Sequence, residues 1–230
     1  LFWWRRDFRR LQTAPLPSDA AEKLVEAVCS APSVGLSESW RFVVVASKTP
    51  RRAMRGNYER ANAIALRGYE GDDARLYASL KLSGMDDAPL QLAVFTDQET
   101  DQGRRLGRET MPETLTYSTV AAVHSLWLAA LAEGIGVGWV SILETDSLNE
   151  TLDVPAVWHF VVYLCVGYPR DVEDRPSLKT AGCESRRAVE DFLIERLALQ
   201  GPRLPRPVRP RRVHRPSDHR FDVLQSSRLR

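Results

Sequence analysis

The 230-residue chain has 43% hydrophobic and 27% charged residues and a formal net charge of +2, which is typical of a globular protein. The charge is uneven, because residues 201–230 carry nine arginines and two aspartates, a net of +7, which leaves −5 for residues 1–200. Since the body is mildly acidic, the sequence argues against a nucleic-acid partner.

The cysteines and the apolar segments also exclude some classes of protein. Cys29, Cys165 and Cys183 are far apart, and no CxxC or His/Cys ligand spacing is present, so we expect no metal site. Cys29 and Cys165 lie in apolar runs and are expected to be small core residues. The longest apolar stretch, 120–132, is too short for a membrane span, and no signal peptide is visible. We therefore expect a cytoplasmic protein without a membrane partner.

The first predicted elements are a helix and a strand. Ser18 is a suitable N-cap, Pro32 stops the helix, and apolar residues recur between them at helical spacing: Leu24, Val25 and Val28. The β-branched run 42–46 predicts a buried strand.

The rest of the body alternates predicted helices and strands. Short apolar runs predict three further strands, at 90–95, 136–143 and 158–166. Helices are expected at 118–133, closed by Gly134, at 187–199, and once or twice within 50–82, with a mobile connection at 68–73. This alternation favours a layered α+β or α/β domain.

The chain divides into an expected domain, residues 1–200, and a tail, residues 201–230. The tail has five prolines and nine arginines and few apolar residues, so we expect it to be disordered. An arm that binds acidic partners or a membrane is the alternative. The chain starts at Leu1, so an N-terminal piece is expected to be missing.

The run Arg5-Arg6-Asp7-Phe8-Arg9 is the strongest candidate for chemistry. Guanidinium groups suit a phosphate, because their planar donors match its oxygens. A carboxylate among these charges could act as a base. A solvated basic patch is the alternative interpretation.

Two segments of small residues are candidates for contact with a flat ligand. Ala31–Gly35 is a turn between the first helix and strand, and it is either a simple turn or a place of close backbone approach. Gly134–Ser141 lacks GxGxxG spacing and enters a strand, so it is not a dinucleotide-binding loop. It is either a glycine hinge or a set of backbone N–H groups that lie, with Ser141, under a planar ring.

These motifs recur in a known order. The ordered set of motifs extends from about residue 5 to residue 192 and resembles the 5,6-dimethylbenzimidazole synthases. Its further members are Tyr77–Leu82, Tyr117–Val120, Leu126–Ala130 and Leu164–Pro169. These synthases are the flavin-destroying branch of the nitroreductase superfamily. Asp7 and the Gly-Trp-Val-Ser segment distinguish the branch, because ordinary nitroreductases usually carry Ser at the position of Asp7.

The resemblance implies a fold and an activity. The fold is α+β, with a central, mainly antiparallel sheet flanked by helices, in an intertwined homodimer with FMN at each of two interfaces. Reduced FMN and dioxygen are converted, without a metal, to erythrose 4-phosphate and 5,6-dimethylbenzimidazole, the lower ligand of cobalamin. An external flavin reductase is the expected source of reduced FMN.

The resemblance also implies roles for residues. Asp7 and Ser141 are the catalytic candidates, Asp7 as acid/base near the ribityl–ring junction and Ser141 near the isoalloxazine. Ser33 and Gly35 are expected to come from the partner subunit. The complete set expected to bind FMN is Arg5, Arg6, Asp7, Arg9, Ser33, Gly35, Lys81, Gly138, Trp139, Val140, Ser141 and Arg186.

Some positions depart from the family pattern. Glu38-Ser39 stands where Gln-Pro is usual, and Cys183 stands where a Trp is expected. Two alternatives therefore stay open. One is a nicotinamide-dependent nitroreductase or flavin reductase that keeps its flavin intact, and the other is a non-catalytic flavin-binding paralogue.

Overall fold

A computed structural model describes residues 1–2, 4–68, 84–171 and 186–194. The chain forms two compact units, Leu1–Cys183 and Glu184–Arg230, and each is described by itself. Several predicted features lie outside the described residues: the motif Tyr77–Leu82 with Lys81, Cys183, most of the connection at 68–73, the end of the helix predicted at 187–199, and the tail at 201–230.

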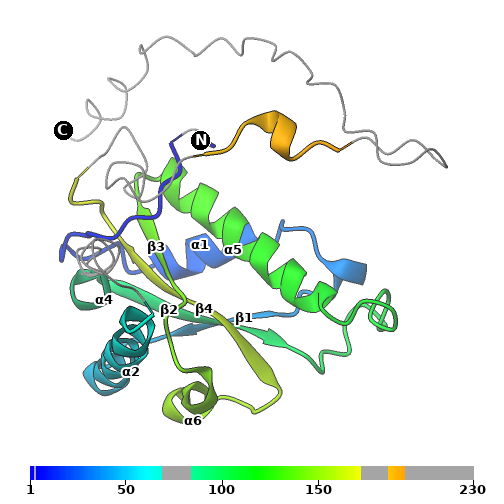
Figure 1. The fold of residues 1–230 in the computed structure, drawn as a ribbon, viewed down its shortest axis with the longest axis horizontal. Coiled ribbons are helices and arrows are strands. Elements are labelled where there is room, and N and C mark those ends of the chain that lie inside the picture. The colour runs from blue at the N-terminus through cyan, green and yellow to red at the C-terminus, as the bar shows by residue number, and fades with distance from the viewer. Residues whose placement is uncertain (3, 69–83, 172–185, 195–230) are drawn as a thin grey trace. The chain divides into compact units, whose positions relative to one another are not determined.

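The first unit is built on a four-stranded antiparallel sheet (Figure 1). The strand order is β1-β2-β4-β3, and the bounds are Trp40–Val44 for β1, Leu90–Asp97 for β2, Gly136–Val140 for β3 and Trp158–Gly167 for β4. The four predicted strands and the antiparallel α+β class are confirmed. β1 begins two residues before its predicted start, and β3 ends at Val140, three residues before its predicted end.

Both faces of the sheet are buried, and the strands divide their side chains between them. In β2, Leu92 and Val94 belong to one apolar cluster, whereas Ala93 and Phe95 belong to the other. This alternation follows from the two-residue period of a strand. Because both faces are covered, the central strands are continuous apolar runs, which is why short runs predicted them correctly.

Helices cover each face. The face of Leu92 packs against α1, Ala20–Val28, and α5, Thr114–Ala132, which lie side by side (Figure 1). The opposite face packs against α2, Lys48–Leu66, and two short helices, α4, Gly84–Asp87, and α6, Leu148–Leu152. The described residues of this unit also form two 3-10 turns, η1 at Val34–Leu36 and η2 at Thr145–Ser147.

Helix α5 begins four residues before the predicted start, and it is apolar on most sides. Within the described residues it is the one helix long and apolar enough to cross a membrane, judged by length and composition alone. Here it packs against α1 and all four strands, which accounts for its composition. Tyr117 and Val120 remain 57% and 40% exposed, so part of this apolar helix is uncovered in one chain.

Three predictions about the helices are wrong. The N-cap of α1 is Asp19 and not Ser18, and the Asp19 carboxylate pairs with Lys23 at 2.7 Å instead of capping. Cys29 is exposed, because it follows the last residue of α1 on the solvent side, whereas Cys165 is buried in β4 as predicted.

The third wrong prediction is the described part, 187–194, of the helix predicted at 187–199. In the described part of the second unit, residues 186–194 form only a 3-10 turn, η3, Val189–Asp191. Its apolar residues Val189 and Phe192 are more than 70% exposed. A short helix is marginal on its own, because most helical stability comes from burial of an apolar face.

Candidate functional site

The N-terminal segment passes the outer edge of β3 from one layer of the domain to the other. At the α5 layer, the carbonyl of Arg6 accepts a hydrogen bond from the Trp127 indole N–H at 3.0 Å. The backbone N–H of Phe8 then donates to the carbonyl of Val137 in β3 at 3.1 Å. Leu11 is fully buried in the opposite cluster. The arginine-rich motif is thereby held at the edge of the sheet and not on a free arm.

Two glycines of β3 make this crossing possible. A Cβ on Gly138 would lie 2.5 Å from the Phe8 carbonyl oxygen, and one on Gly136 would lie 2.9 Å from the Phe8 ring. Both positions face the same side of the strand, because they are two residues apart. The glycine pattern in the sequence therefore reflects the close approach of the N-terminal segment.

Asp7 lies at the centre of this crossing and is half-buried. Its Oδ1 accepts a hydrogen bond from the backbone N–H of Trp139 at 2.8 Å. Burial raises the pKa of Asp7 above 3.8, while the Trp139 hydrogen bond and the charges of Arg9 and Arg5 oppose that rise. A carboxylate with a raised pKa, fixed by one oxygen, is suited to accept a proton with the other.

Arg5 is held by aromatic contacts. Its guanidinium carbon lies 5.0 Å from the ring centroid of Trp127, within the range of a cation–π contact. Trp127 in turn stacks on Trp139, with ring centroids 6.2 Å apart and an angle of 15° between the planes. Trp127 is not among the residues predicted to bind FMN, although it lies in the motif Leu126–Ala130.

The end of β3 supplies the remaining residues of this edge. Trp139 and Val140 are the last residues of the strand, and Val140 is buried. Ser141 follows directly and is exposed. The structure thus brings Gly138–Ser141 to the same edge as Asp7, with the Ser141 hydroxyl open to solvent.

The turn with Ser33 and Gly35 lies near the other end of α5. The backbone N–H of Val34 donates to Ser118 Oγ at 3.0 Å, and Gly35 adopts a φ of 57°. Ser118 and Trp127 are nine residues apart, which is about 14 Å along a helix. Within one chain, Ser33 and Gly35 are therefore remote from the site around Asp7.

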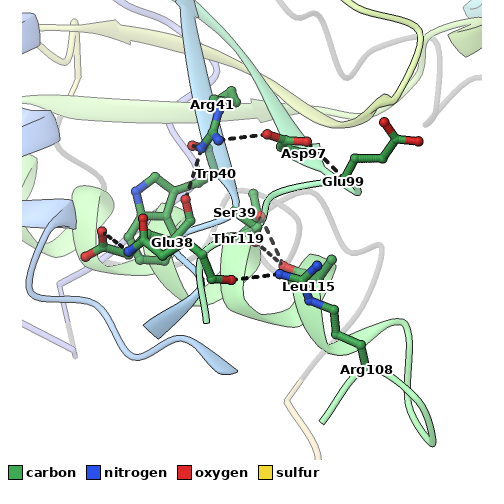
Figure 2. A network of polar contacts seen from close by, with 10 residues as sticks. Glu38, Ser39, Trp40, Arg41, Asp97, Glu99, Arg108, Leu115 and Thr119 are labelled. Carbon is green, nitrogen blue, oxygen red and sulfur yellow. Dashed lines mark hydrogen bonds and ion pairs between the residues drawn. The ribbon is translucent and has the colours of Figure 1, made fainter. Parts of the chain in front are cut away.

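The unusual Glu38-Ser39 pair belongs to a polar network that braces this turn (Figure 2). Ser39 Oγ donates to the carbonyl of Leu115 in α5 at 3.0 Å, a bond that Pro could not form. Arg41 donates to Asp97 and to the carbonyls of Glu38 and Trp40. The departure from the family pattern therefore replaces a proline with a hydrogen bond to α5.

Besides Ser33 and Gly35, two further site residues predicted from the sequence are not assigned to this edge. Lys81 lies outside the described residues, and Arg186 belongs to the second unit. The structure brings together Arg5, Asp7, Arg9 and the end of β3, and Arg6 adjoins them through the backbone.

Comparison with known proteins identifies the family of this chain. The model of the nitroreductase family matches residues 3–168. The 5,6-dimethylbenzimidazole synthase of Rhodospirillum rubrum is 50% identical over 189 residues, which cover 81% of this chain and 89% of that protein. The 5,6-dimethylbenzimidazole synthase of Rhodobacter capsulatus is 42% identical over 187 residues, 81% of this chain and 90% of that protein.

A solved structure shares the fold. The crystal structure of an iodotyrosine deiodinase bound to FMN and 3-iodo-L-tyrosine superposes with a TM-score of 0.65 at 20% identity, covering 81% of this chain and 92% of that chain. The matches of sequence and fold lead to the same conclusion: this chain belongs to the nitroreductase family, in the branch of the 5,6-dimethylbenzimidazole synthases.

Proposed function

We propose that this protein is a 5,6-dimethylbenzimidazole synthase, which uses dioxygen to convert reduced FMN to 5,6-dimethylbenzimidazole and erythrose 4-phosphate. The observation that carries the proposal is the half-buried Asp7, which lies among arginines and is fixed by the Trp139 N–H at 2.8 Å. The identity of 50% to the Rhodospirillum rubrum synthase supports the same activity.

The residues at this edge fit FMN. The charges of Arg5 and Arg9 both act on Asp7, so two cations are available near this carboxylate for the oxygens of a phosphate. In the proposal, Arg5, Arg6 and Arg9 hold the phosphate and ribityl oxygens. The backbone of Gly138–Val140 would lie along the isoalloxazine ring of FMN, and the hydroxyl of the exposed Ser141 would lie beside that ring.

Asp7 is proposed to move a proton at the ribityl chain. Cleavage of a carbon–carbon bond there requires an acceptor near the ribityl hydroxyls, and a carboxylate of raised pKa meets that need. Its Oδ1 is held by Trp139, which leaves Oδ2 for the substrate. Reduced flavin itself supplies the reactivity toward dioxygen, and no metal is invoked.

A homodimer is part of the proposal. Ser33 and Gly35 lie about 14 Å along α5 from the Trp127 end, so they could complete the site only from a second chain. The exposed Tyr117 and Val120 give α5 an apolar surface for that contact. We further propose that a separate flavin reductase supplies the reduced FMN.

The test is incubation of the protein with chemically reduced FMN in air, followed by mass spectrometry for 5,6-dimethylbenzimidazole. Product is expected in air and absent without dioxygen or without protein. Intact flavin together with steady nicotinamide oxidation by a quinone or nitro compound would favour an ordinary nitroreductase. Intact flavin with neither activity would indicate a non-catalytic binding protein.

A further inference from the structure

We infer that Trp127 is a positioning residue, which holds Arg5 and Asp7 in the arrangement that selects a phosphate-bearing flavin. This inference rests on the proposed function, because it assigns Arg5 to the phosphate. Trp127 lies on α5 and is 7% exposed, so it is itself held by the core. Trp127 contacts the motif of Arg5–Arg9 through both its ring and its side-chain N–H.

Trp127 acts on the motif through three separate contacts. The indole N–H donates to the Arg6 carbonyl, which fixes the backbone between Arg5 and Asp7. The ring face lies 5.0 Å from the guanidinium carbon of Arg5. The same ring stacks on Trp139, whose backbone N–H holds Asp7. A change at Trp127 should thus reach both the phosphate-binding cation and the acid/base.

The contacts can be separated by substitution. Trp127→Phe keeps an aromatic face for Arg5 and removes the N–H donor. Trp127→Leu removes both. Leu126→Ala is the matched control, because Leu126 belongs to the same buried cluster on the same helix but offers neither a donor nor an aromatic face. It should lower stability without acting on the motif.

The first measurement is the ratio of the dissociation constants of riboflavin and FMN. In Trp127→Leu the preference for FMN should fall about fivefold, the scale of a partly desolvated cation–π contact. Trp127→Phe should show a smaller fall. Leu126→Ala should keep the ratio of the unmutated protein. If the ratio is unchanged in both Trp127 variants, the inference is wrong.

The second measurement needs no flavin. Hydrogen exchange at the backbone N–H groups of Phe8 and Trp139 should quicken in Trp127→Phe relative to the N–H groups of β2. Leu126→Ala should speed both sets alike. If exchange at Phe8 and Trp139 does not change relative to β2, Trp127 does not position the segment. If the unmutated protein makes no 5,6-dimethylbenzimidazole but exchange responds as expected, the proposed function alone fails.

Discussion

The Oδ1 of Asp7 lies 2.8 Å from the backbone nitrogen of Trp139, a residue 132 positions later in the chain. This bond joins the N-terminal segment to β3 one residue before the strand ends, and the charges of Arg5 and Arg9 act on the same carboxylate. Because burial raises the pKa of Asp7 in spite of this bond, the ionised carboxylate is costly in the folded protein.

Asp7→Asn should therefore stabilise the flavin-free protein at neutral pH. The folded pKa of Asp7 lies above 3.8, so its contribution to stability is complete below that pH and is lost as pH rises through the folded value. Asn stays neutral, keeps an acceptor for Trp139, and avoids this loss. Urea unfolding from pH 4 to pH 7.5 should show a gain that grows with pH.

Asp97→Asn is the control for that experiment. Asp97 pairs with Arg41 at 2.8 Å and accepts the backbone N–H of Glu99, so its replacement should destabilise the protein. A loss of stability in Asp7→Asn at neutral pH would contradict the assigned cost of its charge.

Asp7→Asn should also abolish most of the chemistry. Removal of a general base lowers turnover by about 10²-fold or more, while FMN should bind at least as well because a negative charge near the phosphate is gone. Ser141→Ala should bind FMN and also lose product. In both variants reduced flavin should be reoxidised intact with release of hydrogen peroxide. Near-normal product from Asp7→Asn, measured by mass spectrometry, would exclude the role of Asp7.

The arginine motif should make binding depend on the flavin phosphate. Arg9→Gln should weaken the binding of FMN by about tenfold or more, since one charge-assisted contact is worth about 1.5–3 kcal/mol. The binding of riboflavin should be unchanged. Arg52→Gln removes the same charge from an exposed site on α2 and is the control. Calorimetric titration with both flavins measures the difference. An FMN affinity that Arg9→Gln leaves unchanged would indicate a solvated patch.

Local patterns in the sequence predicted the sheet, because β2 and β4 are buried on both faces and are therefore continuous apolar runs. They did not predict the crossing of β3 by the N-terminal segment. That crossing depends on contacts such as Phe8 with Gly138, which are 130 positions apart and leave no periodic trace. The resemblance placed Asp7 and Ser141 in one site, but only the structure identified Trp127 as their support.

Gly138→Ala tests the crossing directly. The added Cβ would lie 2.5 Å from the Phe8 carbonyl oxygen, a backbone atom that can move only with the whole segment. Such overpacking should cost about 1–3 kcal/mol in the free energy of unfolding and should weaken FMN binding as the arginines shift. Gly56→Ala is the control, because its Cβ would meet only the flexible end of Arg60 at 3.7 Å within α2. That variant should gain about 0.5–1 kcal/mol. Gly138→Ala with unchanged stability would contradict the crossing.

The last prediction concerns assembly. We expect an obligate homodimer with an interface above about 2,000 Å², because α5 leaves Tyr117 and Val120 uncovered and one chain keeps Ser33 far from Asp7. Val120→Asp should place a charge in that interface and yield monomers that bind FMN weakly, because half of each site is lost. Ile64→Asp, at a residue 57% exposed on α2 in the opposite layer, should stay dimeric. Light scattering at micromolar concentration distinguishes these states. A monodisperse monomer of the unmutated protein would overturn the two-chain site, and a dimeric Val120→Asp would place the interface elsewhere than on α5.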